Sequence, residues 1–324
     1  MSPPDAGPDL VVIGDCNPDV LVLGPDVTPA FGQQEKLVDR ISLLVGGSAA
    51  ITAVAAARLG VSVALVAVVG ADPAGAFMLD QLTKEGVDVS AVRIRDDTPT
   101  GMTVALSRGG DRAILTALGA IAALTVADVP RGLLARARHV HVSSYFLLAD
   151  SLGPGLAALL AAARAAGATT SLDTNWDPSG RWGDDQLRAV LAQADVLLPN
   201  EAEALALSGA DSPVAAAAAL AGAGPETTRV FMKLGERGVL CAAGRLLQRV
   251  SLPPVRPVDT TGAGDCFNAG LIAGLLSGLP LTGAAGLGCA AGALSTGALG
   301  GTGSAPGLRA ATELARLAAV ASAE

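Results

Sequence analysis

The 324-residue sequence predicts an α/β protein organised around a mainly parallel sheet. Short, continuous apolar runs at residues 9–14 and 61–69 are typical of strands that are buried on both faces, as in parallel sheets. Between them, residues 46–60 begin with two glycines, continue as a run of helix-forming residues and end at a glycine, which indicates a turn and a helix. The same alternation of strand and helix patterns recurs further along the chain, as expected for an α/β sheet.

The composition indicates which residues form the core and which kinds of binding partner are excluded. Hydrophobic residues make up 51% of the chain and aromatic residues only 2%, so the core must consist mainly of Ala, Val and Leu. The net charge of −8 argues against a nucleic-acid partner or an acidic membrane surface, because both require a basic patch. The length allows one large domain or two.

Cysteine usage and charge spacing bear on the location of the protein. The four cysteines are scattered singly, which favours reduced thiols and a cytoplasmic protein over a disulfide framework or a zinc site. The N-terminal residues carry no positive region before the first apolar run, so we interpret them as a loose tail and not as a signal peptide. No charged residue occurs between Asp265 and Arg309, but Pro280 and many glycines interrupt this segment, and we expect buried helices there instead of a membrane span.

Polar residues follow the first predicted strand. Asp15, Asn17 and Asp19 come directly after residues 9–14. Ligand-binding groups in open α/β sheets gather at the carboxyl ends of strands, but an Asx-type turn around Pro18 would account for the same residues.

Two segments do not fit the alternation of buried strands and helices. Residues 20–45 break irregularly around several glycines and prolines. Residues 98–116 predict a β-hairpin that turns at Gly109-Gly110-Asp111.

The middle of the chain continues the α/β pattern, with a helix at 76–85 and a strand at 139–142. His139 and His141 share one face of this strand, but no third metal ligand is within reach by spacing, so we interpret both as structural. Ser143, Ser144 and Tyr145 end the strand and are candidates to line a ligand pocket.

Further strands and helices follow. Residues 156–166 predict a helix and 170–173 a strand, which leads into a polar and aromatic loop that ends at Asp177. Asn200 and Glu203 have the spacing of a helix-capping pair after the next strand. Residues 230–241 predict a hairpin with glycines at its turn.

The most specific stretch is Val-Asp-Thr-Thr-Gly-Ala-Gly-Asp-Cys-Phe-Asn at 258–268. Gly262, Ala263 and Gly264 precede Asp265 and a long aliphatic segment, which predicts a tight turn that opens a helix. The free N–H groups at such a helix start, together with the macrodipole, favour a phosphate or a developing anion. Asp265 would either accept a proton from an attacking hydroxyl or only stabilise the start of the helix.

This stretch resembles the C-terminal signature of the ribokinase-like, or PfkB, family of carbohydrate and nucleoside kinases. The diglycine at 46–47 and the helix after it resemble the N-terminal signature, and the motifs between Val11 and Ser304 occur in the order typical of the family. The resemblance implies a three-layer α/β sandwich with a mainly parallel central sheet, in a single domain over residues 1–324. It also implies a small β lid formed by segments near 16–45 and 98–117.

By the same resemblance, the protein would be an ATP-dependent kinase that uses Mg²⁺ and K⁺. Asp265 would be the catalytic base, and Gly262, Ala263 and Gly264 the anion hole for the γ-phosphoryl group. The expected acceptor-binding residues are Asn17, Asp19, Gly46, Gly47, Ile51, Tyr145, Asn175 and Asp265. Those expected to bind ATP are Asn200, Glu203, Lys233, Gly235, Gly238 and Gly264. Glu203 would also reach Mg²⁺ through water, and a K⁺ cage would comprise Asp259, Thr261, Ser295, Ala298, Gly300 and Ser304.

Two positions depart from the family pattern. Ile51 stands where the family usually places an Asn, so either the acceptor has no hydroxyl there, or Ile51 turns into the core and Ser48 or Asn175 supplies the hydrogen bond. Asp177 stands where an Arg is usual, which counts against a phosphorylated or acidic acceptor unless Arg181 takes that place.

We therefore predict a kinase for a hydroxyl group of a small neutral carbohydrate. A nucleoside kinase of the same fold is the alternative within the family, and a non-catalytic sugar or nucleotide sensor is the alternative of another class. The expected partners are the acceptor, ATP and a second copy of the chain bound through the lid.

Overall fold

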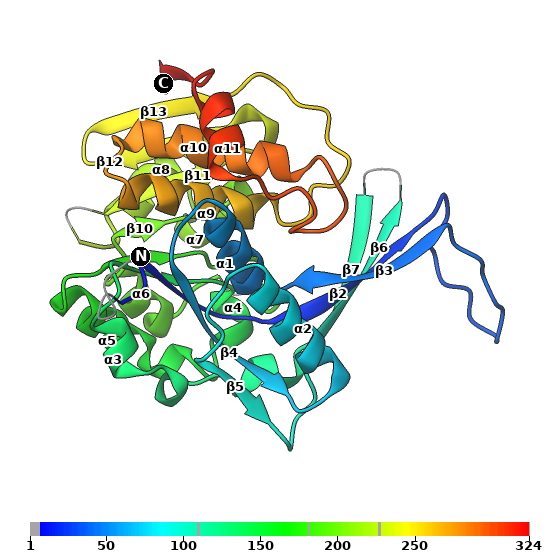
Figure 1. The fold of residues 1–324 in the computed structure, drawn as a ribbon. Coiled ribbons are helices and arrows are strands. Elements are labelled where there is room, and N and C mark those ends of the chain that lie inside the picture. The colour runs from blue at the N-terminus through cyan, green and yellow to red at the C-terminus, as the bar shows by residue number, and fades with distance from the viewer. Residues whose placement is uncertain (1–6, 109–110, 181, 226–227, 324) are drawn as a thin grey trace.

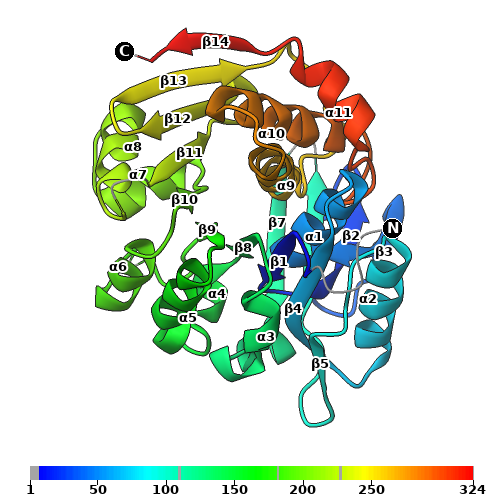
Figure 2. The same ribbon diagram turned by 60° about the vertical axis from the view of Figure 1, so that its left-hand side comes forward.

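The computed structural model describes residues 7–108, 111–180, 182–225 and 228–323. Its central feature is a ten-stranded sheet in the order β14-β13-β12-β11-β10-β9-β8-β1-β4-β5 (Figures 1 and 2). The strands from β5 to β11 in this order are parallel, and the remaining three extend the β11 edge as antiparallel neighbours. The parallel strands are β1 (Leu10–Ile13), β4 (Val63–Gly70), β5 (Val92–Arg95), β8 (His139–Val142), β9 (Thr169–Leu172), β10 (Val196–Leu197) and β11 (Arg229–Lys233). The antiparallel strands are β12 (Val239–Ala243), β13 (Leu246–Ser251) and β14 (Ala319–Ser322). The predicted mainly parallel sheet is confirmed.

Helices cover both faces of this sheet, as Figure 2 shows. Along β1, Val11 and Ile13 belong to the hydrophobic core on one face, and Leu10 and Val12 to the core on the other. The Val11 face is covered by α3 (Arg131–Leu134), α4 (Tyr145–Leu148), α5 (Gly153–Ala165), α6 (Asp185–Leu191), α7 (Glu201–Ser208) and α8 (Pro213–Ala221). The Leu10 face is covered by α1 (Ser48–Arg58), α2 (Pro73–Lys84), α9 (Ala263–Leu276), α10 (Leu281–Ser295) and α11 (Leu308–Ala315). The three predicted layers are therefore present, and both cores are rich in Ala, Val and Leu.

Two predicted helices begin earlier than expected. The helix predicted at 76–85 begins at Pro73, because the side chain of Asp72 accepts a hydrogen bond from the Gly75 N–H and a proline suits the first helical position. The helix predicted at 156–166 begins at Gly153, which is also followed by a proline. Three short 3₁₀ segments, η1 (Gly119–Ala123), η2 (Val126–Asp128) and η3 (Gly235–Arg237), complete the set.

The two irregular segments form a small separate sheet that projects from the body (Figure 1). Its strands are β2 (Asn17–Leu23), β3 (Arg40–Gly46), β6 (Met102–Arg108) and β7 (Asp111–Ala117), in the order β3-β2-β6-β7. The antiparallel pairing of β6 with β7 confirms the predicted hairpin, although Gly109 and Gly110 of its turn lie outside the described residues. The strands fall in the segments that were expected to form the lid.

The strand register gives this small sheet two different faces, because residues directly paired across strands point the same way. One row of pairs is Leu43–Val20–Val104–Leu115, and the next is Ile41–Val22–Leu106–Ala113. We call these eight aliphatic residues the outer face. Asp19 and Leu44 lie on the opposite, inner face, and Leu44 packs beside Gly300.

The uncharged segment after Asp265 forms α9 and α10, which pack against each other with a bend at Pro280 between them. In the described part of the chain, no single helix has both the length and the apolar character needed to cross a membrane. The bent pair α7 and α8, at 63°, meets that test only when its two helices are taken together.

Candidate active site

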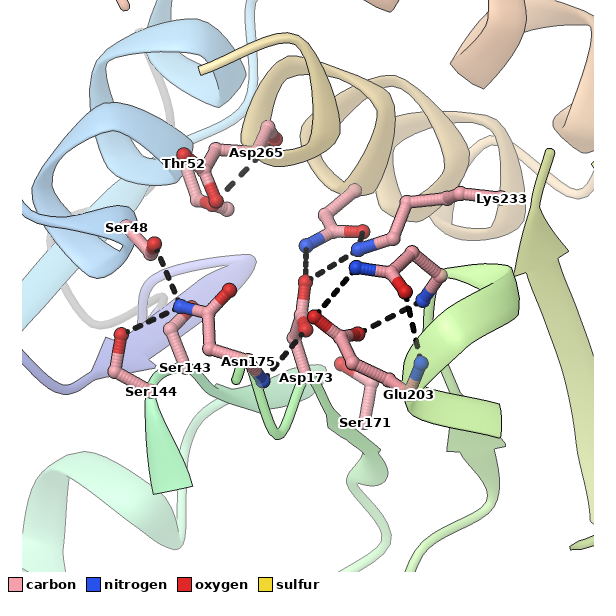
Figure 3. Close-up of polar contacts among 12 residues, drawn as sticks. Ser48, Thr52, Ser143, Ser144, Ser171, Asp173, Asn175, Glu203, Lys233 and Asp265 are labelled. Atoms are coloured by element: carbon pink, nitrogen blue, oxygen red, sulfur yellow. Dashed lines mark hydrogen bonds and ion pairs between the residues drawn. The ribbon is translucent and has the colours of Figure 1, made fainter. Parts of the chain in front are cut away.

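Asn175, Lys233, Glu203 and Asp265, among the predicted functional residues, gather where the carboxyl ends of the parallel strands meet the N-termini of α1 and α9 (Figure 3). Asp15 follows β1, Ser143 follows β8, Asp173 follows β9, and Lys233 ends β11. This arrangement is the usual place for ligands in open α/β sheets.

The small-residue turn at 262–264 opens α9, as predicted. Gly262 has φ +70°, a conformation that favours glycine, and a methyl group added there would lie 2.5 Å from the Cα of Gly301. Within the described residues, no side chain caps this helix start. The first amide groups of α9 therefore fit an anion, because they have no side-chain acceptor and lie at the positive end of the helix dipole.

Asp265 lies in the first turn of α9 and is only 9% exposed. Burial, and after it the negative charge of Asp173, raises the pKa of the Asp265 carboxyl well above its usual range. A hydrogen bond from Ser48 partly offsets this shift. A carboxyl group with a raised pKa is suited to accept a proton near neutral pH. A residue that only stabilised the start of the helix would not require a raised pKa.

A buried network joins Asn268 to Asp173 and Lys233, and Figure 3 shows the last two side by side. The Lys233 ammonium and the Asn268 amide each donate to Asp173 Oδ2 at 2.6 Å. Burial alone would raise the pKa of Asp173, but the charge and hydrogen bond of Lys233, together with the hydrogen bond from Asn268 and the charge of His141, outweigh it, and the net shift is downward. Burial alone would lower the pKa of Lys233, but the neighbouring carboxylates, chiefly Asp173 and Glu203, outweigh it and raise that pKa. Both groups are therefore charged at neutral pH, and the ammonium lies close to Gly264.

Asn200 and Glu203 form the predicted capping pair at the start of α7. Asn200 donates to Glu203 from its backbone N–H at 2.8 Å and from its amide at 2.6 Å, and its Oδ1 accepts the Glu203 N–H at 2.9 Å. Burial, followed by the charge of Asp173, raises the pKa of Glu203 to about 7. In this structure both oxygens of Glu203 are engaged by Asn200, so the capping role is explicit.

The diglycine at 46–47 positions the start of α1. Gly47 has φ +80°, and the backbone N–H groups of Ser48 and Ala49 donate to the two oxygens of Asp15 at 2.9 and 3.0 Å. Asp15 thus holds the helix start, a role that the sequence alone left open.

Asn17 and Asp19 lie beside this turn, at the base of the small sheet. The Asn17 amide donates to Asp19 Oδ1 at 3.3 Å and to Thr103 Oγ1 at 3.2 Å. A side chain at Gly46 would overlap the Asp19 carboxylate, so a larger residue there would displace Asp19 from its present position. In the described structure, the Asn17 amide donates to the Pro18 carbonyl, to Asp19 and to Thr103, and none of these three hydrogen bonds is that of an Asx turn.

Asn175 connects the β9 loop to the start of α1. Its amide donates to Ser48 Oγ and to Ser144 Oγ, each at 2.8 Å, and its backbone has the rare φ of +56° (Figure 3). The next residue, Trp176, is 60% exposed and meets Trp182 edge to face with ring centroids 4.7 Å apart. The acceptor side of the site thus combines hydroxyl and amide groups with an exposed aromatic surface.

Ile51 and Asp177, the two residues that depart from the family pattern, are both buried. Ile51 is 3% exposed and packs in the core against Gly262 and Gly301, which favours the explanation in which Ser48 and Asn175 supply the hydrogen bonds. Asp177 is buried and accepts hydrogen bonds from the backbone N–H groups of Ser179 and Trp182 at 2.8 and 2.7 Å, so it shapes its own loop. Arg181 lies outside the described residues.

Tyr145 does not join the other acceptor residues. Its ring is buried in the core on the Val11 face, and its hydroxyl accepts a hydrogen bond from Gln186 of α6 at 3.2 Å. The polar neighbour Ser144 instead faces the site through its contact with Asn175.

The loop expected to hold a cation is tied to the signature by Asp259. Its Oδ1 accepts hydrogen bonds from the N–H and hydroxyl of Thr261, and its Oδ2 accepts the Gly300 N–H at 2.8 Å. The hydroxyl of Ser295 donates to the Gly292 carbonyl within α10, and Ser304 lies near Gly297 in the same loop. The structure brings Asp259, Thr261 and Gly300 together, whereas Ala298 lies beside Gly303 in the same loop.

A cavity of about 290 Å³ lies between η3 and the start of α9. The predicted hairpin of β11 and β12 forms one wall, and Gly238, with φ +90°, brings its backbone against Val250 and Ser251. The residues that line the cavity include Lys233, Gly235, Gly238, Ala263, Gly264, Cys289 and a wall of prolines at 253, 254 and 257. An apolar pocket beside an anion-binding helix start fits a nucleotide base next to its phosphates.

A model of the pfkB family of carbohydrate kinases matches residues 8–307. The chain belongs to this family. Its members are phosphotransferases that act on hydroxyl groups, so the predicted kinase class is confirmed. A fructokinase of Klebsiella pneumoniae is 34% identical over 271 residues, which cover 82% of this chain and 87% of the relative. A 2-dehydro-3-deoxygluconokinase of Bacillus subtilis is 33% identical over 283 residues, or 81% of this chain and 84% of the relative.

The fold of this family member is also that of solved ribokinases. A candidate ribokinase II of E. coli, solved in complex with ATP and Mg²⁺, superposes with a TM-score of 0.83 at 25% identity and covers 95% of this chain and 99% of that one. The ribokinase-like fold predicted from the motifs is confirmed.

Sequence reasoning missed the roles of Asp173 and Asn268. Asp173 and Asn268 were noted only as part of a loop and of a signature, yet they hold the Lys233 ammonium. The available signal was the position of Asp173 at the carboxyl end of a buried strand.

Replacing Ile51 with Asn is expected to destabilise the fold by about 1–3 kcal/mol, because the amide would be buried against two glycines without a partner. Ile51→Val is the matched control and should cost only about 0.5–1.5 kcal/mol. Urea unfolding compares the two, and kcat/KM for fructose and ribose should not rise in the Asn variant. An Asn variant as stable as Ile51→Val, with a tenfold gain in kcat/KM, would show that position 51 meets the acceptor.

Proposed function

We propose that this protein is an ATP-dependent kinase that phosphorylates a hydroxyl group of a small neutral carbohydrate. The observation that carries the proposal is the Asp265 carboxyl, buried and raised in pKa, in the first turn of a helix whose start no described side chain caps. An anion cradle with a proton acceptor inside it suits phosphoryl transfer to a hydroxyl group. A non-catalytic sensor would need the cradle but not this carboxylate.

The chain's own residues would perform distinct tasks. Asp265 accepts the proton of the acceptor hydroxyl, and the amides of Gly262, Ala263 and Gly264 stabilise the negative charge of the transferred group. The Lys233 ammonium lies beside Gly264 and adds positive charge there. Mg²⁺, held through its waters by Glu203 and by the phosphates of ATP, would neutralise further charge. Gly235 and Gly238 would border the base in the 290 Å³ cavity.

A neutral acceptor is supported by the groups on the acceptor side. Asn17, Asp19, Asn175 and Ser48 can donate and accept hydrogen bonds, but they include no cation that would grip a phosphate or carboxylate. The relatives named fructokinase agree with this choice. The exposed Trp176 is the observation that favours a nucleoside as the second candidate, since an indole can stack on a base.

An ATP-consumption screen with sugars, polyols and nucleosides, in the presence of Mg²⁺ and K⁺, tests the proposal. We expect turnover with at least one neutral sugar or polyol, in the range of ~1–10³ s⁻¹. Turnover with nucleosides alone would replace the sugar by the second candidate, and binding without turnover across the whole screen would favour the sensor. We expect the protein to work in the cytoplasm, where its four free thiols stay reduced.

Potassium is expected to activate the enzyme. Asp259 joins the signature turn to the 295–304 loop, and a cation among the loop carbonyls would fix that loop beside the anion hole. Initial rates in K⁺, Na⁺ and tetramethylammonium at equal ionic strength provide the measurement. Equal rates in all three salts would exclude the cation cage.

We also propose a homodimer that forms through the lid. The outer face is aliphatic throughout, and Ile41, Leu43 and Leu115 are 65%, 46% and 63% exposed, which is unusual for an unpartnered sheet. Leu43→Glu should convert the dimer to a monomer in sedimentation velocity, while Leu317→Glu, at an exposed leucine outside the lid, should not. A wild-type protein that is monomeric at all concentrations would disprove the dimer.

A further inference from the structure

A second, larger cavity of about 800 Å³ lies at the amino ends of β8, β9, β10 and β11. Its wall includes residues that precede or begin these strands, among them Arg138, Thr169, Asp195 and Arg229. Asp173 and Lys233 lie at the other ends of β9 and β11. The cavity therefore opens at the opposite edge of the sheet from the active site.

This cavity carries excess positive charge in an acidic protein. Arg136, Arg138 and Arg229 all line it, whereas Asp195, its one acidic lining residue, is paired with Arg164 at 3.1 Å. Arg138 is engaged by Asp9 at 2.8 Å. Among the described residues, the Arg229 guanidinium has neither an ion pair nor a hydrogen bond. Unsatisfied guanidinium groups in a concave site match the oxygens of a phosphate.

The rest of the wall is apolar. Leu275, Leu279 and Leu281, from the corner between α9 and α10, line the cavity with Pro280. Its volume lies in the range of small-molecule sites and exceeds what a free phosphate fills. A ligand with one anionic group and a small organic body matches both halves of the wall.

We propose that this cavity is a binding site for a small phosphate monoester, such as a sugar phosphate, and that its occupancy influences the active site. The phosphate group would be held by the unpaired arginine charge, and the organic body would lie on the leucines.

A buried hydrogen-bond chain runs from this cavity through the sheet toward the active site. His139 Nδ1 lies 2.6 Å from Thr169 Oγ1, and both residues line the cavity. His139 Nε2 and His141 Nδ1 each lie 2.7 Å from Ser171 Oγ, and His141 Nε2 lies 2.9 Å from Ser143 Oγ. Ser143 and Ser171 lie in the site view beside Ser144 and Asp173 (Figure 3).

The hydrogen bonds of this chain must all point the same way along it, because each member has one proton to donate to its neighbour. Burial lowers the pKa of His139 to about 3 and that of His141 to about 4, so both rings are neutral and each has one N–H donor and one acceptor. Ser171 has one proton for its two histidine contacts, so it donates to one ring and accepts from the other. A ligand that fixes the donor at Thr169 therefore also fixes the direction of the hydrogen bond at Ser143.

Isothermal titration calorimetry with fructose 6-phosphate and with inorganic phosphate tests the binding site. Arg229→Gln should weaken binding of fructose 6-phosphate about tenfold or more, while Arg309→Gln, at an exposed arginine of α11, should leave it unchanged. Comparable binding of both probes would show that free phosphate alone occupies the site and would overturn the role given to the organic body. No heat with either probe, or equal binding in the wild type and Arg229→Gln, would overturn the proposal. This test does not require an acceptor, so its failure is distinguishable from that of the proposed kinase activity.

The influence on the active site rests on the proposed function and needs a rate measurement. Fructose 6-phosphate should change the acceptor KM at least twofold in the wild type and leave it unchanged in Ser171→Ala, which interrupts the chain without touching the cavity. If that variant does not fold, Thr169→Val interrupts the chain at its partly solvated end. A wild-type KM that does not respond to the probe, or a response that persists in both variants, would overturn the coupling.

Discussion

Replacing Asp265 with Asn is expected to lower kcat by at least ~10²-fold and up to ~10⁴-fold, the range for removal of a general base. The amide keeps the shape of the carboxylate, so the cradle and the fold should persist, but it cannot take the acceptor proton. ATP affinity should therefore stay within a few-fold of the wild type. Single-turnover rates and calorimetric ATP binding, measured side by side, separate these two effects.

Asp80→Asn, which removes an exposed carboxylate on α2, is the matched control and should leave kcat unchanged. The pH dependence provides a second readout. Because burial and Asp173 raise the pKa of Asp265, its basic form is gained only as the pH rises through that raised value. The acid limb of the pH profile of kcat/KM should thus have an apparent pKa above ~3.9, the value of an ordinary Asp, and this limb should disappear in the Asn variant. Near-normal turnover of Asp265→Asn would rule out the base.

Replacing Lys233 with Met should cost about 3–5 kcal/mol of unfolding free energy, because it leaves the charge of Asp173 buried without its partner. The Asp173 side chain is 1% exposed and cannot regain hydration in the folded state. The double variant Asp173→Asn with Lys233→Met should recover part of the loss, since no unpaired charge remains. Denaturant unfolding of the single and double variants gives the coupling energy.

Lys84→Met is the matched control, since its ion pair with Asp80 is largely exposed, and its unfolding midpoint should match the wild type. The pKa of Asp173 is lowered, so its contribution is present above the unfolded value and is lost as the pH falls through the folded one. The pKa of Lys233 is raised, so its contribution is lost only as the pH rises through that value. The wild type should therefore hold this stability across the neutral range. A Lys233→Met variant as stable as the control would refute the account.

The sequence predicted the sheet and the signature well because both depend on local chemistry. Continuous apolar runs such as 9–14 can be buried only between two helix layers, and Gly262 meets a positive φ that other residues avoid. The role of Asp173 could not be predicted in the same way, and neither could the contact that Ser48 makes. Their partners, Lys233 and Asn175, are 60 and 127 positions away, and only the strand order brings them together.

The environment of Ile51 was also not predictable from the sequence, although here the motif suggested a contact that the structure does not favour. Its place in the family motif suggested contact with the acceptor, but its side chain is directed by the close approach of Gly262 and Gly301, which only the folded chain reveals. Tyr145 was likewise named for its position after β8, and the turn through Ser144, at φ +58°, directs it into the core.

The chain leaves the large sheet after β1, forms β2 and β3 of the small sheet, and returns through Gly46 and Gly47 to α1. Asn17 and Gly46 are register partners at the base of these two strands, so the residues proposed to bind the acceptor also join the small sheet to the large one. The 290 Å³ cavity proposed for the nucleotide, by contrast, is lined by residues of β11, η3 and α9 and by no residue of the small sheet. If the small sheet closes as a lid, an acceptor bound beside Asn17 would contact it directly, whereas a nucleotide in the 290 Å³ cavity would not. The enzyme would in this way be protected from wasting ATP on water when no acceptor is bound.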